Sequence, residues 1–255
     1  MNIIFVKWGT KYSSEDVNTL YKSLVREDFD YYCYTDDPSG IDPNINIIPI
    51  PAKPALKVWW NKLYMFNKDF PLKSKTIFFD LDVYIRSDPW VILESINWQK
   101  LTLVDCSYKT HVVDSRKHHF DVKINSSVAA WNADAGRIHS IWDKFYSSQK
   151  DYYLRKYAGI DRFIVHEGFH YDVFPSDTVQ SYKYSYNWKA PIVTFEEVDY
   201  GSQDIKSWIE TDREVLFDNF PIHPKLAVAI LFYWVIKTAN RTPRRCTSFN
   251  RVHAR

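Results

Sequence analysis

Two aspartates, Asp80 and Asp82, follow an apolar run at residues 76–79 and are the residues of this sequence best suited to chemistry. If the strand continues through them, side chains two residues apart share one face, and the two carboxylates lie side by side. Paired carboxylates repel each other unless a cation or hydrogen-bond donors separate them. The pair therefore predicts a site for Mn²⁺ or Mg²⁺ whose other ligands are substrate phosphates. The alternative is a pair of turn or helix-cap carboxylates.

The sequence offers no glycine-rich loop for binding phosphates. Its six Gly are scattered, and neither a P-loop nor a G-x-G-x-x-G pattern occurs. If the protein binds phosphates, a divalent cation is the obvious group to neutralise them, which agrees with the acidic pair.

Short apolar segments predict the strands that would position this pair. They are bounded by turn residues and rich in β-branched and aromatic side chains. The segments are residues 3–8, 31–34, 45–50, 76–79, 101–104 and 125–131. Residues 105–123 are polar and rich in His, without a clear period, and predict a loop.

Helices are predicted between several of these strands. Ser13 or Ser14 can cap a helix whose apolar spacing is helical. Its apolar positions are Val17, Leu20, Tyr21, Leu24 and Val25. Residues 58–67 and 137–146 predict further helices. A β-α-β-β beginning is typical of an open, mostly parallel sheet, in which ligands bind beyond the carboxyl ends of the strands.

Six segments, in this order, resemble the GT-A glycosyltransferases, in particular glycosyltransferase family 8 and its small viral and bacterial relatives. They are KWGTKYS, YTDD, WWNKLYMF, FFDLDVYI, NSSVAAWN and GIDRFIVHE. The resemblance covers residues 1–225. It implies a single α/β domain with a Rossmann-like, mostly parallel central sheet flanked by helices. It also implies a metal-dependent enzyme that moves a sugar from a nucleotide-diphosphate sugar to a glycan, lipid or protein acceptor, with weak preference for retention of configuration.

The resemblance also implies which residues hold the nucleotide. They lie in the loop after the first strand and after the second strand, and the first aspartate of the pair joins them. These residues are Lys7, Trp8, Gly9, Tyr12, Asp36 and Asp80.

Three further residues correspond to positions near the diphosphate and the sugar. Lys62 would meet the diphosphate, Asn125 would line the donor sugar, and Asp161 would lie near the donor sugar and the acceptor. Each has a simpler alternative: Lys62 as a solvated helix charge, Asn125 as a turn residue, and Asp161 as a partner of Arg162 or a helix cap. We expect Trp59 and Trp60 to belong to the core rather than to a sugar platform.

A third metal ligand is suggested by residues 222–225, Ile-His-Pro-Lys. Relatives carry an H-G-x-P-K-P-like segment whose His binds the metal, so the resemblance implies that His223 does so here. The match is partial, and a surface histidine is the alternative.

Charge is unevenly distributed along the chain. The net charge is +2, and because seven Lys and Arg but no Asp or Glu follow Asp218, residues 1–218 carry −5. An acidic body argues against nucleic-acid binding, while a basic tail could contact an anionic membrane surface. The apolar run at residues 226–236 is too short to span a membrane. We therefore expect residues 226–255 to form an apolar segment and a basic tail.

The N-terminal residues and the cysteines predict the cellular compartment. The first residues read as a strand rather than a signal peptide, and the three Cys show no C-x-x-C spacing. We therefore expect a cytoplasmic protein, with peripheral membrane contact as an option for the tail.

Three other functions remain open from the sequence. A phosphatase of the haloacid dehalogenase type also carries D-x-D, but its motif lies near the N-terminus and continues differently from Val83-Tyr84. A nucleotidyltransferase would need a glycine-rich loop where only Gly9 occurs. A degenerate sugar-nucleotide-binding protein without turnover is the third alternative.

Overall fold

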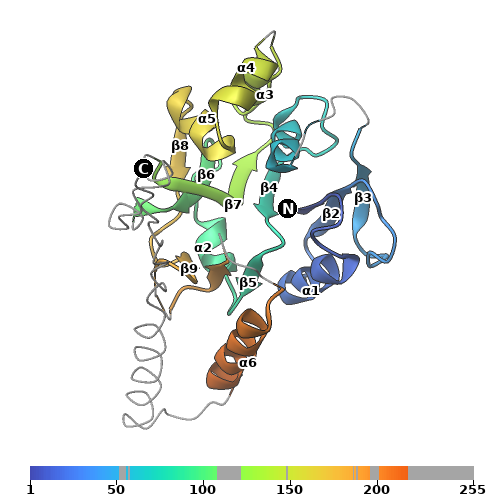
Figure 1. Ribbon diagram of the computed structural model, residues 1–255, viewed down its shortest axis with the longest axis vertical. Coiled ribbons are helices and arrows are strands. Elements are labelled where there is room, and N and C mark those ends of the chain that lie inside the picture. The colour runs from blue at the N-terminus through green and yellow to red at the C-terminus, as the bar shows by residue number, and fades with distance from the viewer. Residues whose placement is uncertain are drawn as a thin grey trace, which may run out of the picture. The chain divides into compact units, whose positions relative to one another are not determined.

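The centre of the fold is a seven-stranded sheet within the residues that the computed structural model describes, which are 1–51, 56, 58–107, 122–147, 149–185, 187, 189–195 and 201–217 (Figure 1). The strand order is β3-β2-β1-β4-β7-β6-β8. The strands are β1 (Asn2–Lys7), β2 (Asp30–Thr35), β3 (Asn46–Pro49), β4 (Lys75–Phe79), β6 (Leu101–Asp105), β7 (Ile124–Asn132) and β8 (Tyr171–Val173).

Strand direction confirms the predicted mostly parallel sheet. β1 pairs in parallel with β2 and β4, β2 with β3, and β6 with β8. β7 is antiparallel to both of its neighbours, β4 and β6. The carboxyl ends of β1, β2, β4 and β6 therefore lie at the same end of the sheet. The reversed strand β7 begins at that end.

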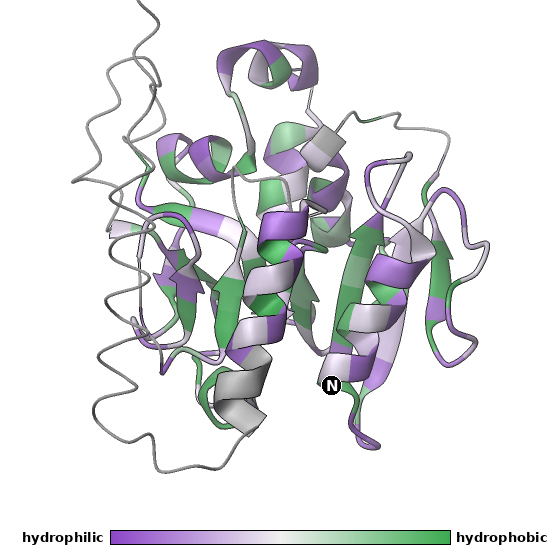
Figure 2. Ribbon diagram, turned by 60° about the horizontal axis from the view of Figure 1, so that its bottom comes forward, coloured by the Kyte–Doolittle hydropathy of each residue, from purple (hydrophilic) through white to green (hydrophobic). Residues whose placement is uncertain are grey.

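Both faces of the sheet are buried, as the apolar run of β1 predicts. Alternate residues of β1 enter two different core clusters: Ile3 and Phe5 pack with one, and Ile4 and Val6 with the other. Helices α1 (Ser14–Leu24) and α2 (Trp90–Glu94) contribute to the first cluster. The 3₁₀ helix η1 (Val58–Phe66) and helices α3 (His139–Phe145), α4 (Lys150–Lys156) and α5 (Ile160–His166) contribute to the second. Figure 2 shows the green strands between helices that carry purple segments.

Helix α1 begins where the sequence predicts. Ser13 is its N-cap and forms a capping box with Asp16, which satisfies two backbone donors of the first turn. Four of the five predicted apolar positions are buried, but Val25 is 54% exposed. That part of the prediction is wrong because the helix ends at Leu24 and Val25 is its C-cap with an extended backbone.

A second sheet of three strands was not predicted. Strands β5 (Val83–Ile85), β10 (Ile192–Thr194) and β9 (Val179–Ser181) pair in the order β5-β10-β9. Buried Arg86 donates to Gln180 Oε1 and to the backbone oxygens of Asn187 and Ala190, which ties the chain after β5 to the segment before β10.

The chain divides into two compact units, Met1–Ile209 and Glu210–Arg255. Helix α6 (Gln203–Phe217) begins in the first, where Ile205 is buried and Trp208 packs against Tyr84. The predicted boundary at residue 225 and the predicted tail at 226–255 lie outside the described residues. Among the residues that are described, none of the helices combines the length and apolar character needed to cross a membrane.

Candidate active site

The acidic pair follows β4 directly but does not belong to it. The strand ends at Phe79, and Asp80 and Asp82 lie in the turn that leads to β5. The predicted strand geometry is therefore wrong, because the chain leaves the large sheet here to join the small one. The Asp82 backbone oxygen accepts the N–H of Phe195 at 3.0 Å. The two carboxylates still interact, since the charge of Asp82 contributes to raising the pKa of Asp80.

Asp80 is held from two sides. Its backbone N–H donates to the Ser127 oxygen at 2.7 Å, which links the turn to β7. Its Oδ2 lies 2.5 Å from the Lys62 ammonium, and the Ser127 side chain hydrogen-bonds the same carboxylate. Burial raises the pKa of Asp80, and Lys62 and Ser127 counteract that shift. Lys62 is thus paired with an acidic side chain and only 15% exposed, unlike a solvated helix charge.

Asp82 faces a different neighbour. The Tyr12 hydroxyl donates to Asp82 Oδ2 at 3.0 Å. Burial of the hydroxyl, followed by the negative charge of Asp82, raises the pKa of Tyr12 far above its usual range, so Tyr12 remains a donor. The loop after β1 is therefore joined to the acidic pair.

The other residues expected to hold a nucleotide lie at the ends of β1 and β2. The N–H of Gly9 donates to Asp36 Oδ2 at 2.9 Å, and Gly9 has φ +60°, which favours glycine. Lys7 is buried, and its ammonium donates to the backbone oxygen of Asp37 at 3.1 Å. Trp8 packs partly buried against the core. Gly9 and Lys7 thus join the loop after β1 to the residues that follow β2.

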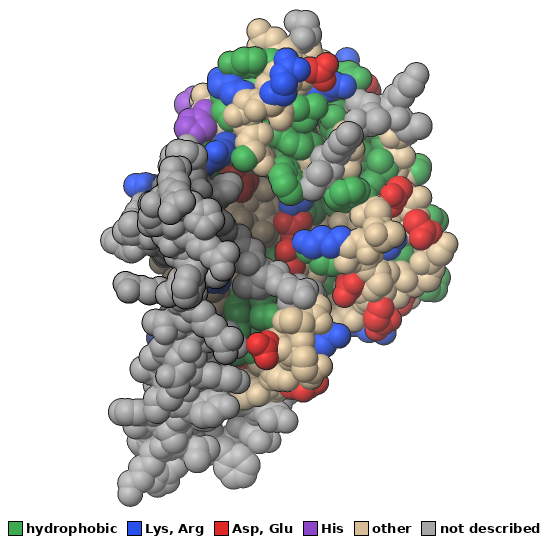
Figure 3. Space-filling model, viewed as in Figure 1, with side chains coloured by type: hydrophobic (Ala, Val, Ile, Leu, Met, Phe, Trp, Pro, Cys, Tyr) green, Lys and Arg blue, Asp and Glu red, His purple; other side chains and the backbone are tan. Residues whose placement is uncertain are grey.

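A cleft of about 240 Å³ is lined by Asp80 and Lys62. It contains four of the predicted site residues, which come from η1, the turn after β4, β7 and α5. Figure 3 shows acidic and basic side chains close together beside a hollow near the centre of this face. The lining residues are Trp59, Lys62, Asp80, Val122, Ile124, Asn125, Ser126, Ser127, Ala158, Gly159, Ile160, Asp161 and Arg162. His223 lies outside the described residues.

The 3₁₀ geometry of η1 explains why two of its side chains enter this cleft. In a 3₁₀ helix, residues three apart lie one above the other. Trp60 and Leu63 are buried in the core, as predicted for Trp60. Trp59 and Lys62 share the next face, and both line the cleft. The expectation that Trp59 belongs to the core is wrong, because 45% of its surface is exposed.

Asn125 is oriented by the start of β7. Its side-chain oxygen accepts the N–H of Ser127 at 2.6 Å, a local bond of the kind that also shapes turns. Ser127 itself was missed by sequence reasoning, although it belongs to the same NSS segment. Its place in this polar segment was the available signal. The pairing of β7 with β6 shifts register here, and Asn125, Ser126 and Ser127 all line the cleft.

The position of α5, which supplies Asp161 and Arg162 to the cleft wall, depends on an ionic cluster at its other end. Glu167, the C-cap of α5, pairs with Lys144 of α3 at 3.0 Å and with Lys156 of α4 at 3.1 Å. The Tyr157 hydroxyl donates to the same carboxylate. Burial raises the pKa of Glu167, but the hydrogen bonds from Tyr157 and the two lysines outweigh it and hold the pKa at about 2.

Replacing Tyr157 by Phe should weaken this cluster and make the free energy of unfolding less sensitive to acid. We expect the free energy of unfolding at pH 7 to fall by about 1 kcal/mol, the net contribution of one hydrogen bond. Because the folded pKa of Glu167 is depressed, its contribution is complete above its ordinary pKa of 4.5 and is lost as pH falls toward about 2. The variant should therefore lose less stability than the wild type in that range.

Urea unfolding at pH 7 and pH 3 measures both effects, with Tyr146→Phe on α3's C-cap as the matched control. Equal acid-induced losses in the wild type and Tyr157→Phe would contradict the role given to this cluster.

A divalent metal fits the acidic pair by the chemistry of its donors. Asp80 and Asp82 supply carboxylate oxygens, which Mg²⁺ and Mn²⁺ prefer. In the described part of the chain, no three or more His, Cys, Asp or Glu side chains are grouped so that they could hold a metal ion. Two protein ligands completed by substrate phosphates remain consistent with this arrangement.

No protein-family model matches the sequence, and a comparison with curated proteins finds no match. Solved structures do match. Galactosyltransferase LgtC, in complex with donor and acceptor sugar analogues, superposes with a TM-score of 0.59 at 13% identity, over 84% of this chain and 94% of LgtC. The glycosyltransferase GlyE of Streptococcus pneumoniae TIGR4 gives 0.55 at 14% identity, over 97% of this chain and 66% of GlyE.

Mouse xyloside xylosyltransferase 1 gives a TM-score of 0.50 at 10% identity, over 77% of this chain and 98% of the mouse protein. At such identities the likeness concerns the fold. All three proteins are glycosyltransferases, and the central sheet of this chain is mostly parallel and flanked by helices, as predicted. The chain therefore has the GT-A-type glycosyltransferase fold.

Proposed function

We propose that this protein is a metal-dependent glycosyltransferase that moves a sugar from a nucleotide-diphosphate sugar to an acceptor. The observation that carries the proposal is the position of the acidic pair between two groups of residues. Asp82 contacts Tyr12 of the β1 loop, and Asp80 contacts Lys62 of the cleft. A donor lying across this pair would have its nucleoside on the first side and its sugar on the second.

The nucleoside side is formed at the carboxyl ends of β1 and β2. This is the edge at which open α/β sheets bind ligands. Gly9 has no side chain and would allow a ribose or base to approach the backbone, while Tyr12 offers a ring beside Asp82. We assign Lys7, Trp8 and Asp36 to the shaping of this loop, because Lys7 and Asp36 are hydrogen-bonded within it and Trp8 packs against the core.

The sugar side is the cleft. Lys62 would exchange part of its contact with Asp80 for the diphosphate, since an ammonium binds phosphate as a point charge. Asn125 would hydrogen-bond sugar hydroxyls, and Asp161, which lines the same cleft, would accept hydrogen bonds from the donor sugar or the acceptor.

A bound Mn²⁺ or Mg²⁺ would stabilise the charge that develops on the leaving nucleoside diphosphate. Asp80 and Asp82 would hold it, with His223 as the third ligand that the sequence suggests. Tyr12 donates to one oxygen of Asp82 and leaves the other for the ion. Lys62 would remain beside the diphosphate and add its charge to the same end of the donor.

Nucleotide titrations test the proposal. UDP, GDP and CDP are titrated into the protein by calorimetry with Mn²⁺ and with EDTA, and nucleotide sugars carrying the best binder are then assayed for release of the nucleoside diphosphate. We expect one nucleoside diphosphate to bind only with the metal, and its sugar derivative to be cleaved slowly by water. Equal binding in EDTA would contradict the metal-dependent site.

The same assays separate the three alternatives. Release of phosphate from an aryl phosphate would indicate a phosphatase. Release of pyrophosphate from a nucleoside triphosphate and a sugar phosphate would indicate a nucleotidyltransferase. Metal-dependent binding of a nucleotide sugar without release of its nucleotide, even when sugar acceptors are added, would indicate a non-catalytic binding protein.

A further inference from the structure

We infer that Trp59 is the stacking platform of an acceptor subsite and that the acceptor presents a hexopyranose ring to it. The inference rests on the proposed function, because the acceptor is defined relative to the donor sugar at Asp80 and Lys62. It selects a glycan among the acceptor classes that the sequence leaves open.

The exposure of Trp59 is the first observation. Its neighbour Trp60 is 5% exposed and Leu63 is fully buried, whereas Trp59 exposes 45% of its surface while lining the cleft. An indole that is half exposed beside polar groups keeps an apolar face available for a ligand. The apolar C–H face of a pyranose ring is chemically suited to such a surface, and its hydroxyls suit the polar walls.

The distance along η1 assigns the ring to the acceptor rather than to the donor. Trp59 precedes Lys62 by three residues, which is one 3₁₀ turn of about 6 Å. Lys62 contacts Asp80, where the diphosphate and donor sugar are placed. A ring on Trp59 therefore lies roughly one hexose from Lys62, beside a residue that is 45% exposed where the Lys62 side chain is 15% exposed, and an acceptor would enter from this exposed side.

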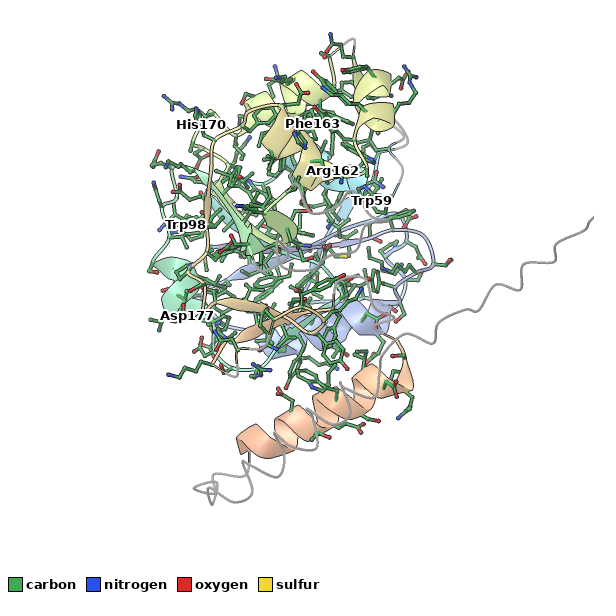
Figure 4. The ribbon with its side chains drawn as sticks, turned by 60° about the vertical axis from the view of Figure 1, so that its left-hand side comes forward. Trp59, Trp98, Arg162, Phe163, His170 and Asp177 are labelled. Atoms are coloured by element: carbon green, nitrogen blue, oxygen red, sulfur yellow. The ribbon has the colours of Figure 1, made fainter. Side chains whose placement is uncertain are left out.

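Gly159 lies directly beside the indole. A Cβ at residue 159 would meet Trp59 Nε1 at 3.4 Å, an ordinary van der Waals contact, so the N-cap of α5 packs against the ring. The backbone of Gly159 is extended, with φ −178°, and does not itself require glycine. The next turn of the chain brings Asp161 and Arg162 to the same cleft, and Figure 4 shows Trp59 and Arg162 close together.

Stacking of the nucleobase on Trp59 is disfavoured by the same geometry. The base would lie beyond Asp82, where Tyr12 joins the β1 loop to the acidic pair. Trp59 lines the cleft together with Asp80 and Lys62, and the lining of that cleft includes no described residue of the β1 loop. A base held by the β1 loop would therefore lie outside the cleft that Trp59 lines.

Ligand-observed NMR tests the inference without requiring catalysis. Saturation-transfer difference spectra are recorded for a panel of methyl α- and β-hexopyranosides with the wild type, Trp59→Phe, Trp59→Leu and Trp59→Ala. Tyr152→Ala on α4 is the matched control, since Tyr152 is 48% exposed, close to the 45% of Trp59, and does not line the cleft. UDP binding with Mn²⁺ is measured for each variant.

We expect ring C–H signals from at least one methyl hexopyranoside. Its affinity should fall about tenfold in Trp59→Leu and Trp59→Ala, less in Trp59→Phe, and not in Tyr152→Ala, while UDP binding is kept. No hexopyranoside signal with the wild type, or equal signals with Trp59→Leu, would overturn the inference. Loss of UDP binding in Trp59→Leu would also overturn it and assign the indole to the base. Failure of the wild type to bind any nucleotide would instead count against the proposed function.

Discussion

Asp82→Asn is expected to lose metal-dependent binding of a nucleoside diphosphate and nearly all sugar transfer, without losing stability. The substitution keeps the size of the side chain and an oxygen that can accept from the Tyr12 hydroxyl, which lies 3.0 Å from the carboxylate. It removes one of two interacting negative charges, so the repulsion with Asp80 is relieved. The unfolding midpoint without metal should therefore stay unchanged or rise.

Calorimetric titration with Mn²⁺ and thermal unfolding in EDTA measure the two effects separately. Asp143→Asn on α3 is a control that removes an exposed carboxylate outside the cleft. Full activity of Asp82→Asn, or metal-independent nucleotide binding by the wild type, would show that the pair does not hold a metal.

Lys62→Met is expected to weaken nucleotide-sugar binding by roughly ten- to a hundredfold, because one charge-assisted hydrogen bond contributes about 1.5–3 kcal/mol. Its ion pair with Asp80 adds a second consequence. In the variant, Asp80 has lost its ammonium partner, although the Asp80 side chain is only 21% exposed. We expect the free energy of unfolding to fall by about 1–3 kcal/mol, less than for a fully buried pair because both side chains keep some contact with water.

Lys68→Met, at an exposed position two residues after the end of η1, is the control for the loss of one positive charge. Binding is measured by calorimetry and stability by urea unfolding, both at pH 7. Unchanged affinity in Lys62→Met would confine Lys62 to its ion pair with Asp80 and remove it from the donor site.

Six of the seven strands of the large sheet were readable from the sequence because each is a short apolar run between polar turns. Strand β8, Tyr-Asp-Val, was missed because it is short and carries no apolar run. The run at residues 3–8 and the run at 76–79 correspond to β1 and β4. The reversal of β7 could not be read, since an apolar strand carries the same signal in either direction. The small sheet could not be read either, because its strands are three residues long and β5 pairs with the distant β10, Ile85 with Ile192.

Site residues were predictable to different degrees for a physical reason. Asp80 and Asp82 stand out because carboxylates flanked by apolar residues are unusual, whatever backbone carries them. The location of Trp59 depended on helix type, since an α-helix and a 3₁₀ helix place residues three apart differently. The spacing of Trp60, Leu63 and Phe66, all buried and three apart, was the available signal for the 3₁₀ helix.

The order of the strands has a consequence for how the site is assembled during folding. β4, which delivers Asp80, lies between β1 and β7, and both partners are distant in sequence: Asn2 pairs with Thr76, and Phe79 pairs with Val128. Closing such long loops precedes the gain from the contacts that they allow, so these pairings form slowly compared with local hairpins. Tyr12 and Ser127 come within reach of the acidic pair when β1 and β7 lie beside β4, whereas Lys62 is only 18 residues from Asp80. Ligand binding would therefore report completion of the central sheet, whereas helical signal from α1 can develop before it.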